Sequence, residues 1–567
     1  MKKHSKVLVL LLAMCLMLTC IAGCGNGGAD GTPTGGVGSG SSDSEGNTPA
    51  AGSKMVGDLE VPEGQQTVLN VGITSDPENL APEAAMGSAS FCKGVIYERL
   101  FDYNPLNISE IIPVMVESYE WLDDTHLQCT LFDHIFDTNG NQIKAEDAVW
   151  SVIHCKDTVY KQKAADIVDE ETYAVDEYTF VIGYTTKNFL WSDNLAGIDI
   201  VSQKSFEESV DGMMTTPVGS GTYKLESYQD GSSMTLVRNE NYWMTEEDAA
   251  KNGAYLHSQN ISKIVFKIIP DATQQIIEFN AGTIDMLRQV PTVSLPDCME
   301  DPTIDLFPAA ATQMKYLYYN CSDDSQMKDV NLRRAVSYAI NNDDIVVGGY
   351  DGFVNKSTQI VASWAQEYVE GWEPYPFDTA KAKECLAESN YNGEPLVIIY
   401  SAENPSDVVL AQIIMEELRA VGISSRIEEI ETASFTSTQT QITTGWDICI
   451  TAAKQTNTIL FTYYNTLNVH ANCRGHWNRY DTSGNAERFQ ELEDQALPDA
   501  VENFDLIKEA QAILEDQCVI YPMHEVTQYY GLRSGIDMDQ LYVAPGNFYF
   551  GDFYPTADAT WLLESAS

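Results

Sequence analysis

A strand–helix–strand pattern in the second half of the chain restricts the folds open to it. Residues 396–400 read Leu-Val-Ile-Ile-Tyr, which is typical of a buried strand, and a second strand is predicted over residues 423–427. Between these strands Leu410, Ile414 and Leu418 recur every four residues, the spacing of one helical face. Such a β–α–β unit predicts two parallel strands with a right-handed crossover. The predicted fold class is therefore α/β with mixed sheets, in which ligands lie beyond the carboxyl ends of the strands.

Similar patterns elsewhere in the chain indicate more than one domain. Apolar and polar residues alternate over 69–73 and end at a Ser-Asp-Pro sequence over 75–77, which predicts a strand followed by a turn. Helical spacing recurs over 332–340 and over 380–386. A folded body of roughly 500 residues is too long for one hydrophobic core, so we expect two or three domains.

The first 24 residues have the form of a lipoprotein export signal. Three lysines precede an apolar run over 7–17, which is shorter than the roughly 20 residues that span a membrane. The run is followed by Ile21-Ala22-Gly23-Cys24, a tetrad that resembles the bacterial lipobox. That resemblance implies removal of residues 1–23 and attachment of a diacylglycerol to Cys24, which would anchor the mature chain stably. The alternative is an ordinary secretory signal with an incidental cysteine.

Residues 24–64 predict a flexible tether behind that cysteine. Gly, Ser, Thr, Asp, Asn, Pro and Ala make up most of the segment, and these residues offer no apolar face whose burial would offset the entropy of ordering. A Gly/Ser-rich chain of this length reaches roughly 35 Å on average. We therefore expect the folded body to sit clear of the membrane surface.

The charge balance excludes several classes of partner. The chain has 83 acidic and 33 basic residues, which give a formal charge of −50. Such a field repels nucleic acid and anionic lipid headgroups, so we expect no nucleic-acid partner and membrane attachment through the lipid alone. We interpret the excess of acidic residues as a contribution to solubility and not as a sign of a function that requires acidic groups.

No motif in the sequence predicts an enzyme, a metal site or a cofactor. The 12 cysteines form no Cys-x-x-Cys pair, and neither His-Glu-x-x-His nor Gly-x-Ser-x-Gly occurs. Asp137, Asn139 and Asn141 begin like a calcium loop, but Gln142 stands where such a loop needs glycine. His470 and His476 lack a third ligand at metal-binding spacing. We therefore predict a binding protein with no metal and no cofactor.

A series of segments resembles, in order, the oligopeptide/dipeptide-binding family (family 5) of bacterial ABC-transporter solute-binding proteins. The most distinctive is Pro-Val-Gly-Ser-Gly-Thr-Tyr-Lys at 217–224, which is similar to the family's glycine-bounded turn before a strand. The other segments are 71–82, 95–101, 113–124, 136–149, 238–243, 282–285, 316–320 and 329–345.

The resemblance implies a type II periplasmic-binding-protein fold, in which two α/β lobes with mixed sheets are joined by two hinge strands. Lobe I is expected over 65–312 and 525–567, with an inserted subdomain near 104–215, and lobe II over 313–524. The crossings are placed near 313–320 and 518–524. A ligand would then lie between the lobes and be enclosed by a hinge motion.

The resemblance also implies a function. We expect a monomeric extracytoplasmic lipoprotein, anchored to the outer face of the cytoplasmic membrane, that captures a peptide or peptide-like solute and delivers it to the permease and ATPase of an ABC importer. Alternatives on the same fold are a receptor for a sugar, an oligosaccharide or another non-peptide ligand, and a surface sensor that is not coupled to transport. Neighbouring genes for permeases and ATPases would favour the importer.

The sequence departs from the family in the segment that usually holds the ligand. Peptide-binding members of the family usually have an Asp in this segment that accepts a hydrogen bond from the peptide ammonium. By resemblance, Thr456 stands at the position of that Asp, and Lys454 adds a positive charge. An ammonium buried without a carboxylate partner is costly. A ligand with an anionic or hydroxyl-rich end is therefore expected, unless Lys454 points into solvent.

The resemblance places further candidate ligand contacts along the chain. Met86, Gly87 and Ser88 fall where the family offers backbone groups to the ligand. For the Trp and Arg candidates given next there is an alternative, because an isolated Trp is often a core residue and an isolated Arg is often a surface residue. The remaining candidates are Tyr319, Trp364, Ala453, Lys454, Gln455, Thr456, Asn457, Arg474, Trp477 and Tyr529.

Overall fold

The computed structural model describes most of the chain beyond residue 52. The described residues are 53–82, 88–158, 160–187, 190–308, 313–363, 368–401, 406–454, 475–496, 498–499, 502–526, 529–541, 543–544 and 547–566. Within these ranges no helix is both long enough and apolar enough to cross a membrane. The predicted signal, Cys24 and residues 24–52 of the predicted tether lie outside them.

The prediction of a tether over 24–64 is wrong for its last part, because residues 54–61 form an antiparallel pair of strands, β1 (Lys54–Val56) and β2 (Leu59–Val61). Val56, Leu59 and Val61 are buried and supply the apolar contacts that a flexible segment lacks.

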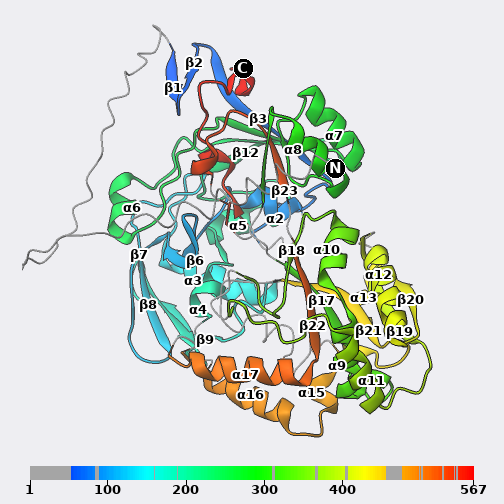
Figure 1. Cartoon of the computed structure of the whole chain (residues 1–567). Coiled ribbons are helices and arrows are strands. Elements are labelled where there is room, and N and C mark those ends of the chain that lie inside the picture. The colour runs from blue at the N-terminus through cyan, green and yellow to red at the C-terminus, as the bar shows by residue number, and fades with distance from the viewer. Residues whose placement is uncertain are drawn as a thin grey trace, which may run out of the picture. The chain divides into compact units, whose positions relative to one another are not determined.

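The first of two large sheets has the strand order β12-β13-β14-β3-β15-β23-β16, with β26 paired to β3 (Figure 1). Its strands are β3 (Gln65–Ile73), β12 (Tyr223–Gln229), β13 (Ser233–Arg238), β14 (Lys263–Ile268), β15 (Met286–Leu287), β16 (Ile304–Pro308), β23 (Tyr529–Arg533) and β26 (Leu563–Ser565). The predicted strand over 69–73 is confirmed as part of β3. It is buried on both faces, as expected for the interior of a mixed sheet.

A helix connects two parallel strands of the first sheet. α7 (Ala272–Ala281) joins β14 to β15, and both strands run parallel to β3. The helix begins after Asp271, whose side chain accepts an N–H of the first turn, and ends at Gly282, which adopts the left-handed conformation with φ 75°. Asp285 then turns inward and accepts the backbone and side-chain N–H groups of Asn70 on β3, each at 2.9 Å. These contacts fix the crossover against the sheet.

The second large sheet has the order β18-β22-β17-β21-β19-β20. Its strands are β17 (Gln313–Tyr319), β18 (Asn355–Lys356), β19 (Leu396–Ser401), β20 (Ser425–Ile430), β21 (Ile448–Lys454) and β22 (Ile520–Val526). The β–α–β prediction is confirmed, because β19 pairs in parallel with β20 and α12 (Ser406–Val421) connects them. The helices predicted over 332–340 and 380–386 are confirmed as α9 (Val330–Ala339) and α11 (Thr379–Glu388).

A third, antiparallel sheet with its own hydrophobic core lies within the range where an inserted subdomain is expected. Its order is β7-β8-β10-β9, and α3 (Ala145–His154) packs against it. The strands are β7 (Val116–Trp121), β8 (His126–Leu131), β9 (Ile167–Ala174) and β10 (Thr179–Tyr184). The hydrophobic core around this sheet includes Leu100, Trp243 and Met244. This core therefore includes residues on both sides of the range 104–215, and the inserted subdomain remains a prediction.

Shorter elements complete the described fold. The helices are α2 (Ser88–Lys93), α4 (Trp191–Leu195), α5 (Gln203–Glu208), α6 (Glu246–Asn252), α8 (Leu295–Glu300), α10 (Asn342–Tyr350), α13 (Thr432–Gln441), α15 (Trp477–Tyr480), α16 (Asn485–Ala496) and α17 (Phe504–Gln517). The strands are β1 (Lys54–Val56), β2 (Leu59–Val61), β4 (Glu98–Arg99), β5 (Phe101–Asn104), β6 (Asn107–Pro113), β11 (Asp199–Ile200), β18, β24 (Val543–Ala544) and β25 (Asn547–Phe548).

The glycine-bounded motif at 217–224 permits a close approach of two chain segments. A Cβ atom on Gly219 would lie 2.2 Å from the carbonyl oxygen of Ile96, and one on Gly221 would lie 2.5 Å from that of Val95. The Gly221 N–H donates to the Ile96 carbonyl at 2.9 Å. Glycine is required here because any side chain would overlap the neighbouring backbone.

The chain passes from the first sheet to the second at the carboxyl edges of both. β16 is antiparallel to β23, which is antiparallel to β15, so β16 runs parallel to β3 and its last residue, Pro308, lies at the carboxyl edge. β17 is antiparallel to β21, a strand parallel to β19, and its first residue, Gln313, pairs with Lys454 at the end of β21. The first passage therefore joins one carboxyl edge to the other.

The return passage connects the same two edges. Val526, the last residue of β22, pairs with Gln313, and Tyr529, the first residue of β23, pairs with Pro308. Figure 1 shows β17 and β22 side by side, in agreement with their antiparallel pairing. The segments expected as crossings, near 313–320 and 518–524, are thus strands of the second sheet, and the passages themselves are the short connections beyond them.

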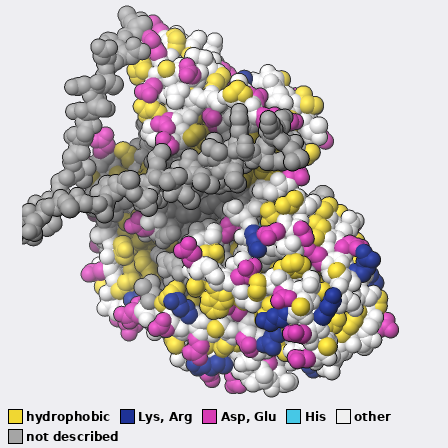
Figure 2. Space-filling model, viewed as in Figure 1, with side chains coloured by type: hydrophobic (Ala, Val, Ile, Leu, Met, Phe, Trp, Pro, Cys, Tyr) yellow, Lys and Arg dark blue, Asp and Glu magenta, His cyan; other side chains and the backbone are white. Residues whose placement is uncertain are grey.

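The acidic composition is visible on the described surface, and most of the described cysteines lie in the core. Acidic side chains are spread over the described face of the molecule in Figure 2 and do not gather in a single patch. Eight cysteines are described, and seven of them are buried. Burial raises the pKa of most of these thiols, for example that of Cys518 to about 11, which makes them unreactive core residues.

Candidate functional site

Asp76 lies where β3 ends, at the carboxyl edge of the first sheet. Its carboxylate accepts hydrogen bonds from the Tyr228 hydroxyl and from the N–H groups of Gly231 and Glu78. Partial burial alone would raise the pKa of Asp76, but these hydrogen bonds outweigh it and the pKa is lowered. An ionised carboxylate therefore fixes the turn that leads from β3 toward the predicted contacts at 86–88.

Arg288 follows β15 directly and lies at the same edge. Its guanidinium group is 4.7 Å from the ring centroid of Phe91 on α2, within the range of a cation–π contact. Burial lowers the pKa of Arg288, yet a guanidinium stays charged at neutral pH in proteins. The first edge thus presents a partly buried positive charge held against an aromatic ring.

A buried ion pair marks the carboxyl edge of the second sheet. The Lys315 ammonium on β17 lies 2.6 Å and 2.7 Å from the two carboxylate oxygens of Asp407, in the first turn of α12. The two side chains are 6% and 1% exposed, so the pair is shielded from water. Burial raises the pKa of Asp407 and the Lys315 charge opposes that rise. The pair joins the start of the first passage to the helix that follows β19.

Two residues near the end of β22 lie beside this pair. His524 stands opposite Lys315 in the strand pairing, its ring centroid is 4.4 Å from that of Tyr350, and its Nε2 has no hydrogen-bond partner. Burial, with a smaller contribution from Lys315, lowers the pKa of His524 to about 4, so the ring is neutral at pH 7. Glu525 accepts the backbone N–H of Ser363 at 2.6 Å. Polar groups therefore line both strands that lead to the passages.

Charged and aromatic side chains of the described residues lie at both carboxyl edges: Arg288 and Phe91 at the first, and Lys315, Asp407 and His524 at the second. Among the described residues, no three His, Cys, Asp or Glu side chains gather closely enough to hold a metal ion. In open α/β sheets ligands bind beyond the carboxyl ends of the strands, where these side chains lie.

Comparison with known proteins identifies the family. Residues 110–471 match the description of bacterial extracellular solute-binding proteins, family 5 (middle region), a range that spans more than half of the 567 residues. The chain belongs to family 5 of the bacterial extracellular solute-binding proteins. The resemblance drawn from the sequence motifs is thereby confirmed.

Relatives of the chain in family 5 bind chemically different ligands, as their names state. The chain is 24% identical to heme-binding protein A of Haemophilus influenzae over 384 residues, which cover 60% of this chain and 65% of that protein. It is 22% identical to the dipeptide-binding protein of Escherichia coli over 391 residues, or 63% of this chain and 70% of that protein. The match thus spans just under two thirds of the first relative's length.

A solved structure of the family has the same fold. NikA from Brucella suis, in complex with Fe(III)-EDTA, aligns with a TM-score of 0.73 at 19% identity and covers 86% of this chain and 100% of its own. The predicted α/β fold of a periplasmic binding protein is confirmed. These relatives are binding proteins, as the absence of catalytic motifs in the sequence led us to expect.

The structure places three of the predicted contacts at the carboxyl edges. Tyr529 begins β23 beside the return passage and is half-buried. Ala453 and Lys454 end β21 next to the first passage, although only their backbone is described. These three positions remain proposed contacts of a family 5 ligand.

Most other predicted contacts are not located. Ser88 begins α2, and its side chain is not described. The contacts outside the described residues are Met86, Gly87, Trp364, Gln455, Thr456, Asn457 and Arg474.

Two predicted contacts are corrected, because they lie in the core at the opposite end of the second sheet. Tyr319 pairs with Ile448, the first residue of β21, and is therefore roughly 20 Å along β17 from the carboxyl edge. Its side chain is fully buried and its hydroxyl hydrogen-bonds to that of Ser337 at 2.8 Å. Trp477 is 3% exposed and packs edge-on against Phe489. Neither side chain reaches the region between the edges.

Lys315, Asp407 and Arg288 were missed by the sequence reasoning. A signal existed for the first of them, since a lysine within the apolar strand Gln-Met-Lys-Tyr-Leu-Tyr-Tyr must be paired if it is buried. The partner could not be found from the sequence, because Asp407 lies 92 residues away and meets Lys315 only through the fold.

Proposed function

We propose that this family 5 protein is an extracytoplasmic solute-binding lipoprotein of an ABC importer, which captures its solute between the carboxyl edges of the two sheets. The observation that carries the proposal is that the chain crosses twice between those edges, from Pro308 to Gln313 and from Val526 to Tyr529. Closure about two short connections would enclose a solute and present a closed form to a permease.

The solute is proposed to have an anionic or hydroxyl-rich end. Arg288 supplies a partly buried positive charge at the first edge, and Lys454 ends a strand at the second. Thr456 replaces the carboxylate that would neutralise a free peptide ammonium. A modified or N-blocked peptide, or another acidic solute, therefore fits better than an ordinary free peptide, and sugars form the second class to be tried.

Thermal shift across a ligand library tests this proposal. Peptides with free and blocked N-termini, acidic peptide-like solutes and oligosaccharides are compared, and a true ligand at 100 times its Kd should stabilise by roughly 2.7 kcal/mol. We expect the strongest shifts from the blocked or acidic solutes. Stronger shifts from free di- and tripeptides, unchanged in Lys454→Ala and Thr456→Ala, would contradict the assignment of ligand class.

Arg288 provides the matched variant for this ligand assay. Arg288→Gln should weaken an anionic hit at least about 10-fold, since a charge-assisted hydrogen bond contributes about 1.5–3 kcal/mol. Arg419→Gln, which removes an exposed cation from α12, should leave the affinity unchanged. Equal affinity in both variants would remove Arg288 from the proposed site.

Cys24 is proposed as the lipid anchor. Metabolic labelling with a fatty acid should mark the wild-type chain and fractionate it with membranes. Cys24→Ser should abolish the label and release the protein into the soluble fraction, because one covalent anchor carries the attachment. Retention of label in that variant would show that another residue is modified.

Co-purification distinguishes an importer component from a surface sensor. The lipidated, ligand-loaded protein is expected to retain the permease and ATPase subunits after mild cross-linking in its producing cell. Recovery of a sensor kinase and no permease would contradict the importer proposal and would indicate a signalling function.

A further inference from the structure

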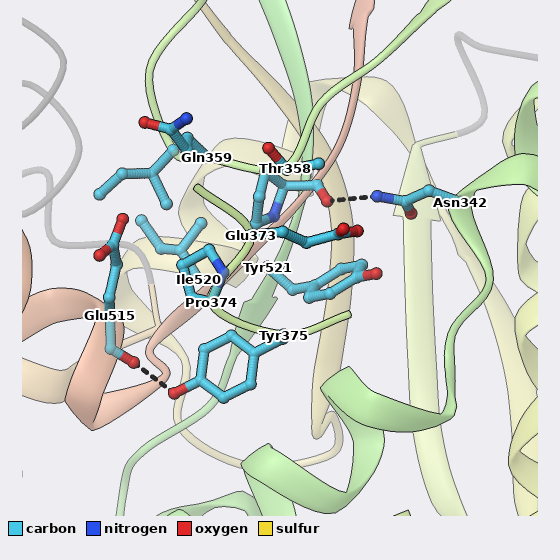
Figure 3. A pocket seen from close by; sticks show the side chains of 11 residues that line it. Asn342, Thr358, Gln359, Glu373, Pro374, Tyr375, Glu515, Ile520 and Tyr521 are labelled. Atoms are coloured by element: carbon cyan, nitrogen blue, oxygen red, sulfur yellow. Dashed lines mark hydrogen bonds between the residues drawn. The ribbon is translucent and has the colours of Figure 1, made fainter. Parts of the chain in front are cut away.

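Cavities in the described structure differ in what they can hold. The pocket in Figure 3 has an interior of about 10 Å³, roughly the room that one water molecule needs. In this pocket the Tyr375 hydroxyl donates to the backbone carbonyl of Glu515, a contact that ties two of its sides together. A second cavity, along β16, has a volume of about 750 Å³, which lies within the range of ligand-binding pockets. We call this second cavity the β16 slot.

The β16 slot lies along the free edge of the first sheet. Its lining consists of Pro105, Cys298, Met299, Met538, Leu541 and all five residues of β16. β16 stands last in the strand order, and among the described strands only β23 pairs with it. One side of β16 thus carries backbone groups that no neighbouring strand uses.

The strand register shows which backbone groups lie on that side. The Ser534 N–H donates to the Thr303 carbonyl at 2.9 Å, in register with the pairing of β23 and β16. Hydrogen-bonded pairs alternate along an antiparallel ladder, so residues 305 and 307 also direct their backbone groups to β23. The residues that direct theirs to the slot are Ile304, Leu306 and Pro308.

Leu306 offers the slot both a donor and an acceptor. The Ile304 N–H already donates to the Asp301 carbonyl at 3.2 Å, and the proline at 308 has no N–H. Within the described residues no group is hydrogen-bonded to the Leu306 N–H, and the carbonyls of Ile304 and Leu306 face the same side. An extended chain laid along β16 therefore finds a donor between acceptors, which is the pattern that an added strand needs.

The slot has a wall on each face of the sheet. Successive side chains of a strand point to opposite faces. Leu306 packs against the hydrophobic cluster that contains Cys298 of α8. Phe307 belongs instead to the cluster against which Met538 and Leu541 pack. The slot therefore suits an extended chain with apolar side chains on both of its faces.

Three kinds of extended chain differ in how they fit the slot. Residues 25–52 are mostly Gly, Ser and Thr, so their side chains leave the apolar walls unfilled. Pairing with β16 of a second copy would bring two α8 helices to the same face of one joint edge, where each already covers its own slot. A peptide solute meets neither obstacle. The slot also ends at Pro308, where the chain first leaves the carboxyl edge, so it is continuous with the proposed solute region.

We propose that the β16 slot binds the extended part of a peptide solute, which adds to the first sheet as a strand. The inference rests on the proposed function and narrows its solute to a peptide. The strand is antiparallel, since antiparallel pairs are slightly the more stable. One peptide residue then exchanges two hydrogen bonds with Leu306, and its N-terminal and C-terminal neighbours lie opposite Phe307 and Asp305.

This pairing specifies the side chains of the peptide. Apolar residues suit the positions opposite Phe307 and Leu306, because both walls are apolar. A basic residue suits the position opposite Asp305, which is the one charged residue in the lining.

Titration calorimetry with acetyl-Thr-Val-Leu-Lys-Thr-amide tests the proposal on the full mature chain. The leucine of this peptide is placed opposite Leu306 and its lysine opposite Asp305, and its blocked ends carry no charge. We expect saturable binding with a Kd of about 1 mM or tighter. Absence of saturation would overturn the proposal.

Backbone methylation of the peptide tests for strand addition on the unaltered protein. N-methylation of the leucine removes the donor to the Leu306 carbonyl and should weaken binding at least about 10-fold. N-methylation of the lysine is the matched control, because N–H groups alternate in direction along a strand and this one points away from β16. It should leave the affinity unchanged. Equal affinities of the two methylated peptides would overturn strand addition.

Protein variants locate the peptide. Leu306→Pro removes the N–H that faces the slot, and an edge strand tolerates proline at such a position, so the fold should persist. This variant should bind the peptide at least about 10-fold more weakly, whereas Leu306→Val, which keeps the N–H, should bind nearly as the wild type does. Wild-type affinity in Leu306→Pro would contradict the assignment.

Asp305→Asn tests the basic position. The variant should weaken the lysine peptide by about 2- to 5-fold, as expected for an ion pair near the surface. It should not change the affinity of the analogue that has alanine in place of lysine. An equal effect on both peptides would remove Asp305 from the recognition of the lysine.

The outcomes separate this inference from the proposed function. Peptide affinity that is lost in Arg288→Gln and kept in Leu306→Pro would place the peptide between the carboxyl edges, which overturns the slot and leaves the proposed function standing. Loss in Leu306→Pro alone supports the slot. If the thermal-shift library then gives no hit that depends on Arg288, the proposed solute region fails while the slot remains.

Discussion

Lys315 and Asp407 are two charges placed where water does not reach. Lys315→Met leaves Asp407 buried without its cation, a change that typically costs about 3–5 kcal/mol. We predict a loss of unfolding free energy of that order in urea titrations followed by circular dichroism. The double variant Lys315→Met/Asp407→Leu should recover most of the loss, because it removes both charges. A single variant within about 0.5 kcal/mol of wild type would show that the pair is not buried in solution.

Because Glu493 on α16 is buried, we predict that the free energy of unfolding depends on pH. The side chain is buried, neither carboxyl oxygen has a hydrogen-bond partner, and burial, aided slightly by Asp494, raises the pKa of Glu493 to about 8. In the unfolded chain a glutamate has a pKa of about 4.3. The stabilising contribution is therefore fully present below pH of about 4 and is lost as pH rises to about 8.

Glu493→Gln removes this dependence. At pH 5 the variant and the wild type should have similar unfolding free energies, and at pH 8 the variant should be more stable by roughly 2–4 kcal/mol. Glu491→Gln, an exposed neighbour on the same helix, should show no such divergence. Parallel pH profiles for the wild type and Glu493→Gln would contradict the buried placement of this carboxyl group.

At the scale of single residues, the sequence could indicate types of contact but not partners. The turn at Asp76 was predicted, whereas its hydrogen bond from Tyr228 spans 152 residues. Tyr319 and Trp477 were misassigned, because an aromatic residue near a family motif has the same sequence pattern in a core as in a binding site. Strand register, which a single sequence does not determine, decides between the two.

Among the structural elements, the motif at 217–224 gives a direct test of packing. Gly219→Ala would place a methyl group 2.2 Å from the Ile96 carbonyl oxygen, so we predict a destabilisation of about 2 kcal/mol or more. Gly348→Ala on α10 is the matched control. Its methyl group would meet only the end of the Ile413 side chain at 3.1 Å, and alanine favours a helix over glycine by about 1 kcal/mol.

Thermal unfolding of the two alanine variants compares them directly. Gly219→Ala should melt several degrees below the wild type, and Gly348→Ala should melt close to it or above it. Equal melting temperatures for both variants would mean that the segments at 96 and 219 do not approach as closely as described.

Regular elements were the most predictable part of the fold. β19 and α12 follow from their sequence patterns, because β19 is apolar and buried throughout and the apolar residues of α12 recur on one buried face. The core around the third sheet was less predictable. Trp243 and Met244 join it from more than 25 residues beyond residue 215, through contacts that leave no local signature.

The whole molecule depends on how two sheets are joined. Each passage leaves one carboxyl edge and enters the other, so both sheets direct the same edge toward the connection. This arrangement explains why charged side chains such as Arg288 and Lys315 occur at those edges while the opposite edge is filled by core residues such as Tyr319. The family resemblance predicted two lobes and two crossings, but the edges they connect became evident only from the strand pairing.

Hydrogen–deuterium exchange with and without the best ligand from the thermal-shift library tests the central claim most directly. We predict slower exchange on ligand binding at both carboxyl edges, over residues 74–82 and 288–290 in the first sheet and over 313–316, 452–454 and 524–526 in the second. Exchange at the amino edge around Tyr319 should be unchanged. Protection confined to one sheet, or located at the amino edges, would contradict capture of the solute between the two carboxyl edges.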